Sequence, residues 1–426
     1  MRVKTIESEL TMDHIEQAIQ KKTSKNKKQN KKNNQKWAIL SISSIPLVMT
    51  LGNSMLIPVL PVMEKKLSIN SFQVSMIITI YSIVAIFLIP IAGYLSDHIG
   101  RKKVIIPSLL IAGIGGIVSG WAAWKLENPY TVILIGRALQ GVGAAGAQPI
   151  VMPLVGDMFK NEDDVSSSLG LIETSNTFGK VLSPILGALL AGVIWFLPFF
   201  SIPVFCLCSI ILMLFLVKTP NKREEPIPFK EFFQHIKDIF TQKGKWLYAI
   251  FLIGAILMLV LFGILFYLSD LLEKSYHIKN IKKGLLLALP LCSLCASSYI
   301  TGKLIKQNKI LMKWMIFVSC LGAMISVALL SLNDQLWFMI MLFLLCGIGI
   351  GAALPCLDAM ITEGIEKEQR GTISSIYSSM RFIGVAAGPP ITALLLKHAE
   401  NWMFYIFSLI LLIAALATFL AIKPKS

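Results

Sequence analysis

The segment Gly93–Ile105 reads GYLSDHIGRKKVI and lies between two long apolar runs. Gly100 allows a tight reversal of the chain, because it has no side chain to obstruct one. Arg101 and the two lysines after it form the kind of basic cluster that marks the cytoplasmic ends of membrane-spanning helices. Gly93 lets a neighbouring helix approach, and Asp97 follows four residues later. The segment therefore predicts a short charged turn between two membrane-spanning helices.

The composition of the whole chain agrees with this prediction. The chain has 426 residues, of which 55% are hydrophobic, and its mean hydropathy is +0.70. These values exclude a soluble globular protein and leave room for many spans of about 20 residues each. The net charge of +16 does not indicate nucleic-acid binding, because ten lysines and arginines lie in the first 36 residues and many others gather in alternate loops. We therefore predict an all-α polytopic membrane protein.

Apolar runs divide the chain into two groups of six predicted spans. They cover residues 37–63, 72–95, 104–124, 130–153, 166–192 and 198–217, and then 246–269, 284–305, 312–332, 336–357, 372–396 and 402–422. Residues 1–36 are too polar to bury themselves and are expected to form a disordered, basic cytoplasmic tail. Residues 218–245 carry phenylalanines at helical spacing, which predicts a cytoplasmic linker with an amphipathic helix on the inner membrane surface. The predicted organisation is a six-helix half at 37–217 and a second at 246–426, with both termini cytoplasmic.

One loop that this topology places outside disagrees with the expected charge bias. It contains four lysines, namely Lys274, Lys279, Lys282 and Lys283. Positively charged residues are normally enriched in the inner loops. The exact boundaries of this helical hairpin are therefore left open.

The two halves are related in sequence. Residues 141–149 read GVGAAGAQP and residues 347–355 read GIGIGAALP, and the same separation of 206 residues pairs Pro184 with Pro390. An internal repeat is the economical explanation. A looser alignment pairs Gly93 with Gly302, but the second copy lacks the acid and the arginine of the charged turn. Two related six-helix halves predict a binding site between them near the middle of the membrane.

Several motifs resemble signatures of the major facilitator superfamily over nearly the whole chain after the tail. The charged turn is similar to the family's G-x-L-A-D-x-x-G-R-K signature, with Ser96 in place of alanine and His98 in place of the usual base. The first span contains Leu51-Gly52 and Pro58-Val59-Leu60-Pro61, similar to the pattern of twelve-helix drug exporters, and the fourth contains Arg137, Gln140, Gly141 and Gly143, similar to R-x-x-Q-G-x-G. The resemblance implies a twelve-helix secondary transporter.

The fifth span resembles the family's antiporter signature. The matching residues are Gly170, Gly179, Ser183, Pro184 and Gly187, with Ser183 replacing a glycine. Gly179, Ser183 and Gly187 are four residues apart, so they form a row of small side chains that a facing helix can approach closely. The alternative to a transport role for this row is close packing alone.

Glu173, Asn176, Thr177 and Lys180 form a polar stripe on the same helix as this row. Charges at that depth cost about 3 kcal/mol each on insertion scales, so they are expected to face an interior cavity. Glu173 is the one carboxylate that the predicted boundaries place well inside a span. A carboxyl group shielded from water can exchange a proton near neutral pH, which makes Glu173 the candidate proton carrier. Alternatively, Glu173 and Lys180 neutralise one another through Asn176.

Three basic residues are expected near this cavity, namely Arg137, Lys180 and Arg381. Three bases against one acid favour an anionic or zwitterionic amphiphile, such as a catecholate siderophore, an acidic antibiotic or an anionic lipid. Alternatively, Arg137 serves helix packing or, as the family resemblance also implies, proton coupling. Gln140 is expected to line the cavity, and Gly93, Asp97, Gly100 and Arg101 are expected to act as a latch that holds the halves together on the inner side. Local turn structure is the alternative for these four.

The resulting hypothesis is a monomeric plasma-membrane transporter that exports an amphipathic small molecule in exchange for protons. Its partners are then the substrate, protons and the lipid bilayer, with no nucleic acid. No enzymatic chemistry, cofactor or metal is expected, and Cys292 and Cys295 are interpreted as apolar filler. Uptake or lipid flipping on the same scaffold is one alternative. A membrane sensor or scaffold that does not transport is another, although it would have no need for intramembrane charges.

Overall fold

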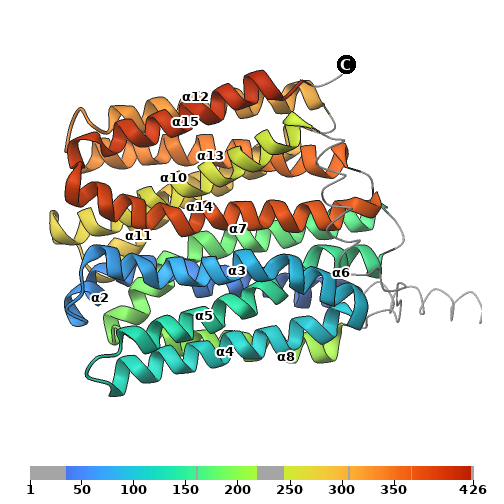
Figure 1. Ribbon diagram of the computed structural model, residues 1–426, viewed down its shortest axis with the longest axis horizontal. Coiled ribbons are helices and arrows are strands. Elements are labelled where there is room, and N and C mark those ends of the chain that lie inside the picture. The colour runs from blue at the N-terminus through green and yellow to red at the C-terminus, as the bar shows by residue number, and fades with distance from the viewer. Residues whose placement is uncertain (1–34, 160–161, 218–243, 306–307, 366, 424–426) are drawn as a thin grey trace, which may run out of the picture.

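The computed structural model describes residues 35–159, 162–217, 244–305, 308–365 and 367–423. The predicted tail at 1–36 lies almost entirely outside the described residues. The predicted linker helix at 218–245 also falls outside them, apart from its last two positions. Within the described residues the fold is a bundle of long helices that run roughly parallel to one axis (Figure 1).

Twelve described helical segments are long and apolar enough to cross a membrane, in agreement with the sequence. The first half contains the first span, Gln35–Lys66, which includes η1 (Ile57–Val59) and α2 (Leu60–Lys66), then α3 (Ser71–Ile99), α4 (Arg101–Lys125), α5 (Tyr130–Ala147) with α6 (Val151–Met158), α7 (Glu162–Val193) and α8 (Leu197–Leu216). The second half contains α10 (Lys245–Lys274), α11 (Asn280–Ile305), α12 (Lys309–Leu329), α13 (Leu336–Gly364), α14 (Lys367–His398), and η2 (Glu400–Trp402) with α15 (Met403–Ala421). The all-α fold class is confirmed.

The charged turn has the form that its sequence predicts. Helix α3 ends at Ile99 and α4 begins at Arg101, so a single residue reverses the chain. That residue, Gly100, has φ 104° and ψ 139°, a conformation that residues with a Cβ rarely adopt.

The two halves repeat the same packing. In the first half α4 packs on α5 and α8, and α3 packs on α5; in the second half α12 packs on α13 and α15, and α11 packs on α13. Gly141 lies against the backbone of Tyr81 on α3, and its repeat partner Gly347 lies against the backbone of Pro290 on α11. A methyl group at either glycine would collide with a carbonyl oxygen. The packing confirms the internal repeat that the sequence predicts.

A second symmetric pair fixes the last helix of each half. The Lys102 ammonium at the start of α4 donates to the carbonyl oxygens of Leu214 and Val217 at the end of α8, at 3.2 and 2.8 Å. Lys313 near the start of α12 donates to the carbonyl of Phe419 near the end of α15 at 3.2 Å. Carbonyls at a helix end lack helical partners, and a cation there also opposes the helix dipole favourably. Each half therefore holds its own terminal helix in the same way.

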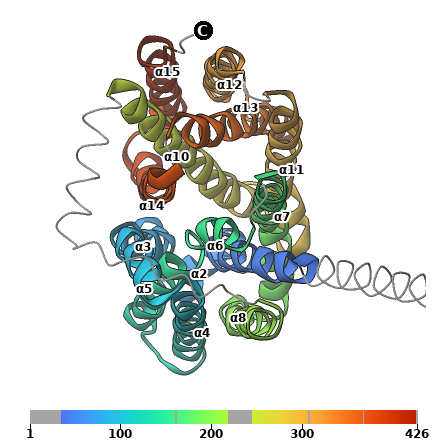
Figure 2. The same cartoon turned by 90° about the vertical axis from the view of Figure 1, so that its right-hand side faces the viewer.

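The halves meet along three lines of helices. Helix α3 packs on α14, α7 packs on α11, and α10 packs on η1 and α2 (Figure 1). Thr79 donates to the carbonyl of Ala386 at 2.8 Å, and Ser269 donates to the carbonyl of Ile57 at 2.8 Å. Seen along the helices, the two halves lie on opposite sides of a central region lined by α7, α10 and α14 (Figure 2). This arrangement places the interior face of α7 opposite the second half.

Candidate transport site

Four charged side chains from both halves come together between the halves. Glu173 and Lys180 lie on α7, Asp358 lies on α13, and Arg381 lies on α14. Arg381 Nη1 is 3.6 Å from Asp358 Oδ1, and both charges interact electrostatically with Glu173 and Lys180. We call these four residues the central charge cluster. It contains two acids and two bases.

Asp358 is a cluster residue that the sequence analysis missed. The tenth span was predicted to end at residue 357, whereas α13 continues to Gly364. A carboxylate lowers the local hydropathy, so a span predicted from hydropathy ends just before the carboxylate even where the helix continues. The signal that could have found Asp358 is the apolar sequence on both sides of it, because Leu357 precedes it and Ala359-Met360-Ile361 follows. The structure thus adds Asp358, near the end of the span Leu336–Ile361, to the carboxylates within the spans.

Asn176 connects Glu173 to the first span. Its amide nitrogen lies 3.2 and 3.3 Å from the two carboxylate oxygens of Glu173, and its Oδ1 accepts a hydrogen bond from the Thr50 hydroxyl at 2.6 Å. Thr177, also predicted to line the cavity, donates instead to the backbone carbonyl of Glu173 at 2.8 Å. Asn176 thus bridges Glu173 to Thr50, whereas the sequence analysis considered a bridge to Lys180.

The cluster is partly open to solvent although it lies within membrane-spanning helices. The side chain of Asp358 is 35% exposed and that of Arg381 is 18% exposed, while Lys180 is buried. Buried charges that lack water or a partner are costly, so charges at this depth are expected to line a hydrated space. The exposed parts of Asp358 and Arg381 agree with this expectation.

Arg137 and Gln140 lie inside the first half, away from this cluster. The Arg137 side chain is fully buried and donates to Ile77 O at 2.8 Å, Gly52 O at 3.1 Å and Asn53 Oδ1 at 2.8 Å. It also donates to Gln140 Oε1, and its guanidinium lies 4.7 Å from the centre of the Tyr81 ring. The expectation of three bases against one acid is therefore wrong, and the charge argument for an anionic substrate loses its basis.

The row of small residues on α7 faces the first span. Gly187 lies directly against the backbone of Met55, and a Cβ at Gly179 would be 3.3 Å from Leu47 O. Ser183 between them is buried and donates to its own helix at Gly179 O, at 2.6 Å. The row thus allows close packing within the first half. Gly170 differs, since a Cβ there would meet nothing within 4 Å.

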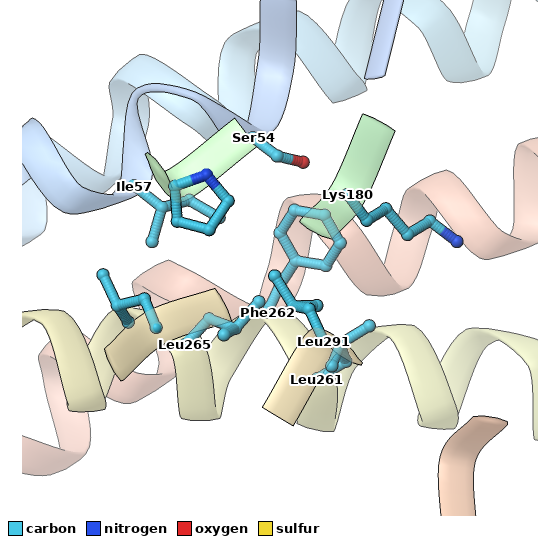
Figure 3. Close-up of a pocket in the computed structure, with 9 residues that line it drawn as sticks. Ser54, Ile57, Lys180, Leu261, Phe262, Leu265 and Leu291 are labelled. Atoms are coloured by element: carbon cyan, nitrogen blue, oxygen red, sulfur yellow. The ribbon is translucent and has the colours of Figure 1, made fainter. Parts of the chain in front are cut away.

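An apolar pocket adjoins the cluster beside Lys180 (Figure 3). Its walls come mainly from α10 and α11 in the second half, with Ser54, Ile57 and Pro184 from the first half; the residues of α10 and α11 are Leu261, Phe262, Leu265, Leu287 and Leu291. The stem of Lys180 contributes to the wall, while its ammonium points away from the apolar side chains (Figure 3). Its volume is about 10 Å³, which is room for about one water molecule and not for a group of a substrate.

The charged turn forms an ion-paired unit within the first half. Arg101 binds Asp97 and also Asp157 of α6, whose Oδ2 is 3.1 Å from its Nε, and it donates to the Ser96 hydroxyl at 2.7 Å. Gly93 approaches the other half, since a Cβ there would lie 3.7 Å from the Ser375 hydroxyl of α14. The latch across the halves remains a prediction.

A set of ion pairs joins the halves at the end of the bundle opposite residues 35 and 423. We call it the far-end network; it consists of Glu64 and Lys65 of α2, Asp270, Glu273 and Lys274 of α10, and Lys283 of α11. Lys274 lies 3.1 Å from Glu64 of the other half and 2.8 Å from Asp270. Lys283 and Glu273 are only 2% and 4% exposed, and their charged atoms are 2.7 Å apart.

This network accounts for two of the four unexpected lysines, Lys274 and Lys283. Lys274 is the last residue of α10, and Lys283 lies in the first turn of α11, so neither belongs to the connecting loop. Both are paired with carboxylates, so they do not act as free positive charges in a loop. Two other pairs of the network, Lys274 with Glu64 and Lys65 with Glu273, cross between the halves and hold them against one another at this end.

No metal centre is evident in the described part of the chain, where no group of three His, Cys, Asp or Glu side chains could hold an ion.

Comparison with known proteins supports the architecture. A family profile described as Major Facilitator Superfamily matches residues 42–389 and 312–426. The bacillibactin exporter of Bacillus subtilis (strain 168) is 57% identical over 371 residues, which cover 87% of this chain and 92% of that protein. Multidrug resistance protein 2 of the same organism is 24% identical over 401 residues, covering 92% and 96% of the two chains.

Among solved structures, the fold is similar to that of a bacterial homolog of the human lysosomal transporter Spinster in an inward-facing, unoccupied conformation. The TM-score is 0.74 at 16% sequence identity, with 91% of this chain and 97% of that chain covered. At this identity the likeness shows the fold alone.

Proposed function

Because this chain belongs to the major facilitator superfamily, we propose that it exports a siderophore of the bacillibactin type in exchange for protons. It is a multi-pass membrane transporter rather than an enzyme. The observation that carries the substrate is the 57% identity with the bacillibactin exporter, which extends over 92% of that protein. Multidrug resistance protein 2 is similar at a much lower identity of 24%, so a broad drug specificity is the second candidate.

In this proposal, the internal repeat is the basis of alternating access. Two halves with the same internal packing can rock against one another around a site between them. The far-end network would close one side of the site, and the charged turn, with Gly93 against Ser375, would take part in closing the other. The abundance of lysine and arginine in the tail and alternate loops supports a plasma-membrane orientation with both termini in the cytoplasm.

Two carboxylates are the candidate proton carriers. Glu173 is the one proposed from the sequence, and Asp358 joins it because it shares the cluster and is partly accessible. Each has a neighbouring group that can respond to its charge, Asn176 for Glu173 and Arg381 for Asp358. Arg137 would support coupling indirectly, by fixing the helices of the first half.

The test is transport in proteoliposomes with an imposed pH gradient. Bacillibactin and a panel of cationic, zwitterionic and anionic drugs would be offered to wild type, Glu173→Gln and Asp358→Asn. We expect gradient-driven bacillibactin flux in wild type, loss of coupling in at least one variant, and normal flux in the control Glu127→Gln, which alters an exposed loop residue. Absence of bacillibactin flux would refute the substrate, and flux that ignores the gradient would refute the antiport.

A further inference from the structure

Two buried side chains reach across the interface between the halves and donate to backbone carbonyls. The Thr79 hydroxyl of α3 donates to Ala386 O of α14 at 2.8 Å. The Ser269 hydroxyl of α10 donates to Ile57 O of the first span, also at 2.8 Å. Both donor residues are almost inaccessible, with exposed fractions of 4% and 1%. A carbonyl inside a helix normally accepts from an N–H group of its own helix, so two such carbonyls bound from the other half need an explanation.

The sequence after Ala386 explains why its carbonyl is free. A helical carbonyl accepts from the N–H group three or four residues later, and here both positions hold proline, Pro389 and Pro390. Proline has no N–H group, so neither a 3₁₀ bond nor an α-helical bond can form. Inside a membrane such a carbonyl must find another donor, and the hydroxyl of a threonine can be that donor. Thr79 supplies it from the opposite half.

Ile57 shows a weaker form of the same arrangement. Pro61 removes the N–H group that would make the α-helical bond to Ile57 O, but the Leu60 N–H group still binds this carbonyl. Ser269 therefore adds a second hydrogen bond to an acceptor that already has one. Its loss should cost less than loss of the Thr79 bond.

The internal repeat shows that this donor and this acceptor occur together. Helix α7 corresponds to α14, and the separation of 206 residues places Ser183 opposite Pro389. The looser separation of 209 residues places Ala288 of α11 opposite Thr79. The α7–α11 contact thus has neither the two consecutive prolines nor the hydroxyl, although it is the counterpart of the α3–α14 contact. The hydroxyl is present where the helix leaves a carbonyl free, which argues against an accidental contact.

The Thr79–Ala386 bond lies between the central charge cluster and the far end of the bundle. Ala386 follows Arg381 by five residues on α14, which places it about 8 Å closer to the far end. Helices α3 and α14 lie next to one another in both views (Figure 1, Figure 2). Opening of the site toward the far end must therefore separate these two helices at this bond.

Resting on the alternating access of the proposed function, we infer that the Thr79 hydroxyl holds the far-end side of the transport path closed by binding the carbonyl that Pro389 and Pro390 leave free. Separation of the helices breaks this bond and admits water to both groups. Loss of the hydroxyl leaves Ala386 O without its donor in the closed state, where a buried unpaired carbonyl is costly. In the state open at the far end, water satisfies the carbonyl with or without Thr79. The hydroxyl thus stabilises the closed state alone.

The experiment measures hydrogen exchange by mass spectrometry on the purified full-length protein in nanodiscs, with no substrate and the same pH on both sides. Thr79→Val removes the hydroxyl at nearly constant volume. We expect exchange to become about three- to tenfold faster at the far-end segments, residues 71–79 and 391–398, as the loss of an interhelical hydrogen bond implies. Exchange should become slower at the opposite ends, residues 93–99 and 373–377, because the halves close there when they open at the far end.

Three further variants show whether the shift comes from this carbonyl. Thr392→Val makes the same substitution at a buried residue of α14 whose hydroxyl donates to its own helix at 2.9 Å, and it should leave exchange unchanged. Ser269→Ala should shift exchange in the same direction as Thr79→Val, but less. Pro390→Ala supplies an N–H group to Ala386 O, so adding Thr79→Val to this variant should have little further effect.

Three outcomes would overturn the inference. Faster exchange at both ends of α3 and α14 would mean that Thr79→Val only loosens the packing. Unchanged exchange at the far end, or an undiminished effect in the Pro390→Ala background, would exclude the role of the carbonyl. Thr79→Ala replaces Thr79→Val if the valine variant does not fold, since it removes the same hydroxyl. Because bacillibactin flux is measured separately, a shift in exchange without flux would refute the proposed substrate alone, whereas gradient-driven flux without a shift would refute the role of Thr79.

Discussion

Neutralising Glu273 should open the far-end network. In the wild type, Lys283 and Glu273 are buried together, and Lys65 of the other half lies 4.0 Å from Glu273. The Glu273→Gln substitution leaves the Lys283 ammonium buried without its carboxylate. Removing one partner of a buried ion pair typically costs about 3–5 kcal/mol. Lys283 can relieve that cost by losing its proton or by gaining water, and separation of the halves at this end would admit water.

The expected result is a change in conformational population. Since about 1.4 kcal/mol corresponds to a factor of ten, even half of the lower estimate would shift the balance toward the open far end by about tenfold. Hydrogen exchange measured by mass spectrometry would report this shift at the contact segments, residues 57–66 and 269–284. Faster exchange is expected in both segments, with little change in the core of α12.

A double variant controls for simple misfolding. Glu273→Gln with Lys283→Met removes both charges, and well-packed apolar replacements of buried pairs are often neutral or stabilising. The double variant should therefore return exchange to the wild-type level or below. If Glu273→Gln leaves exchange unchanged while its melting temperature also stays constant, the buried pair does not hold the far end closed and the reasoning is refuted.

Three further predictions concern other parts of the chain. Asp97→Asn should impair transport with insertion and melting temperature nearly intact, because the turn would lose a charge but no packing; normal flux would reject the latch. Gly141→Ala and Gly347→Ala should each destabilise the protein by about 1–3 kcal/mol, because the same collision occurs at both repeat positions; thermal melts showing a large effect at one site alone would contradict the symmetry. Arg137→Met should lower stability by on the order of 3 kcal/mol, because several buried acceptors lose their donor, whereas Lys180→Met should cost far less; equal melting temperatures for the two variants would argue against this difference.

The helices and the turn could be predicted because they depend on local sequence. Runs of apolar residues have the length of a span. The tight turn between α3 and α4 could be predicted from Gly100, because glycine permits a reversal within one residue. The repeat was also visible, because matching glycines imply matching close approaches. These features need no knowledge of which distant residues meet.

The residues of the site were harder to assign because their partners are distant in sequence. Arg137 resembled a cavity base until its partners Gly52 and Ile77 could be identified in other helices. Asp358 was missed because its pairing with Arg381 lets the helix continue past a charge. Lys283 resembled a loop residue for the same reason, since Glu273 compensates its burial. In each case a contact with a residue distant in sequence lowers the free-energy cost of placing a charge inside the bundle.

Lys102 and Lys313 occupy matching positions in the two halves, and each donates hydrogen bonds to the end of the last helix of its half. These contacts have a consequence for how the protein folds. Lys102 fastens the sixth span to the third within residues 35–217, and Lys313 does the same within residues 244–423. Each half therefore closes its outermost helix without help from the other. A gene cut between codons 217 and 244 should therefore yield two polypeptides that fold separately and then dock.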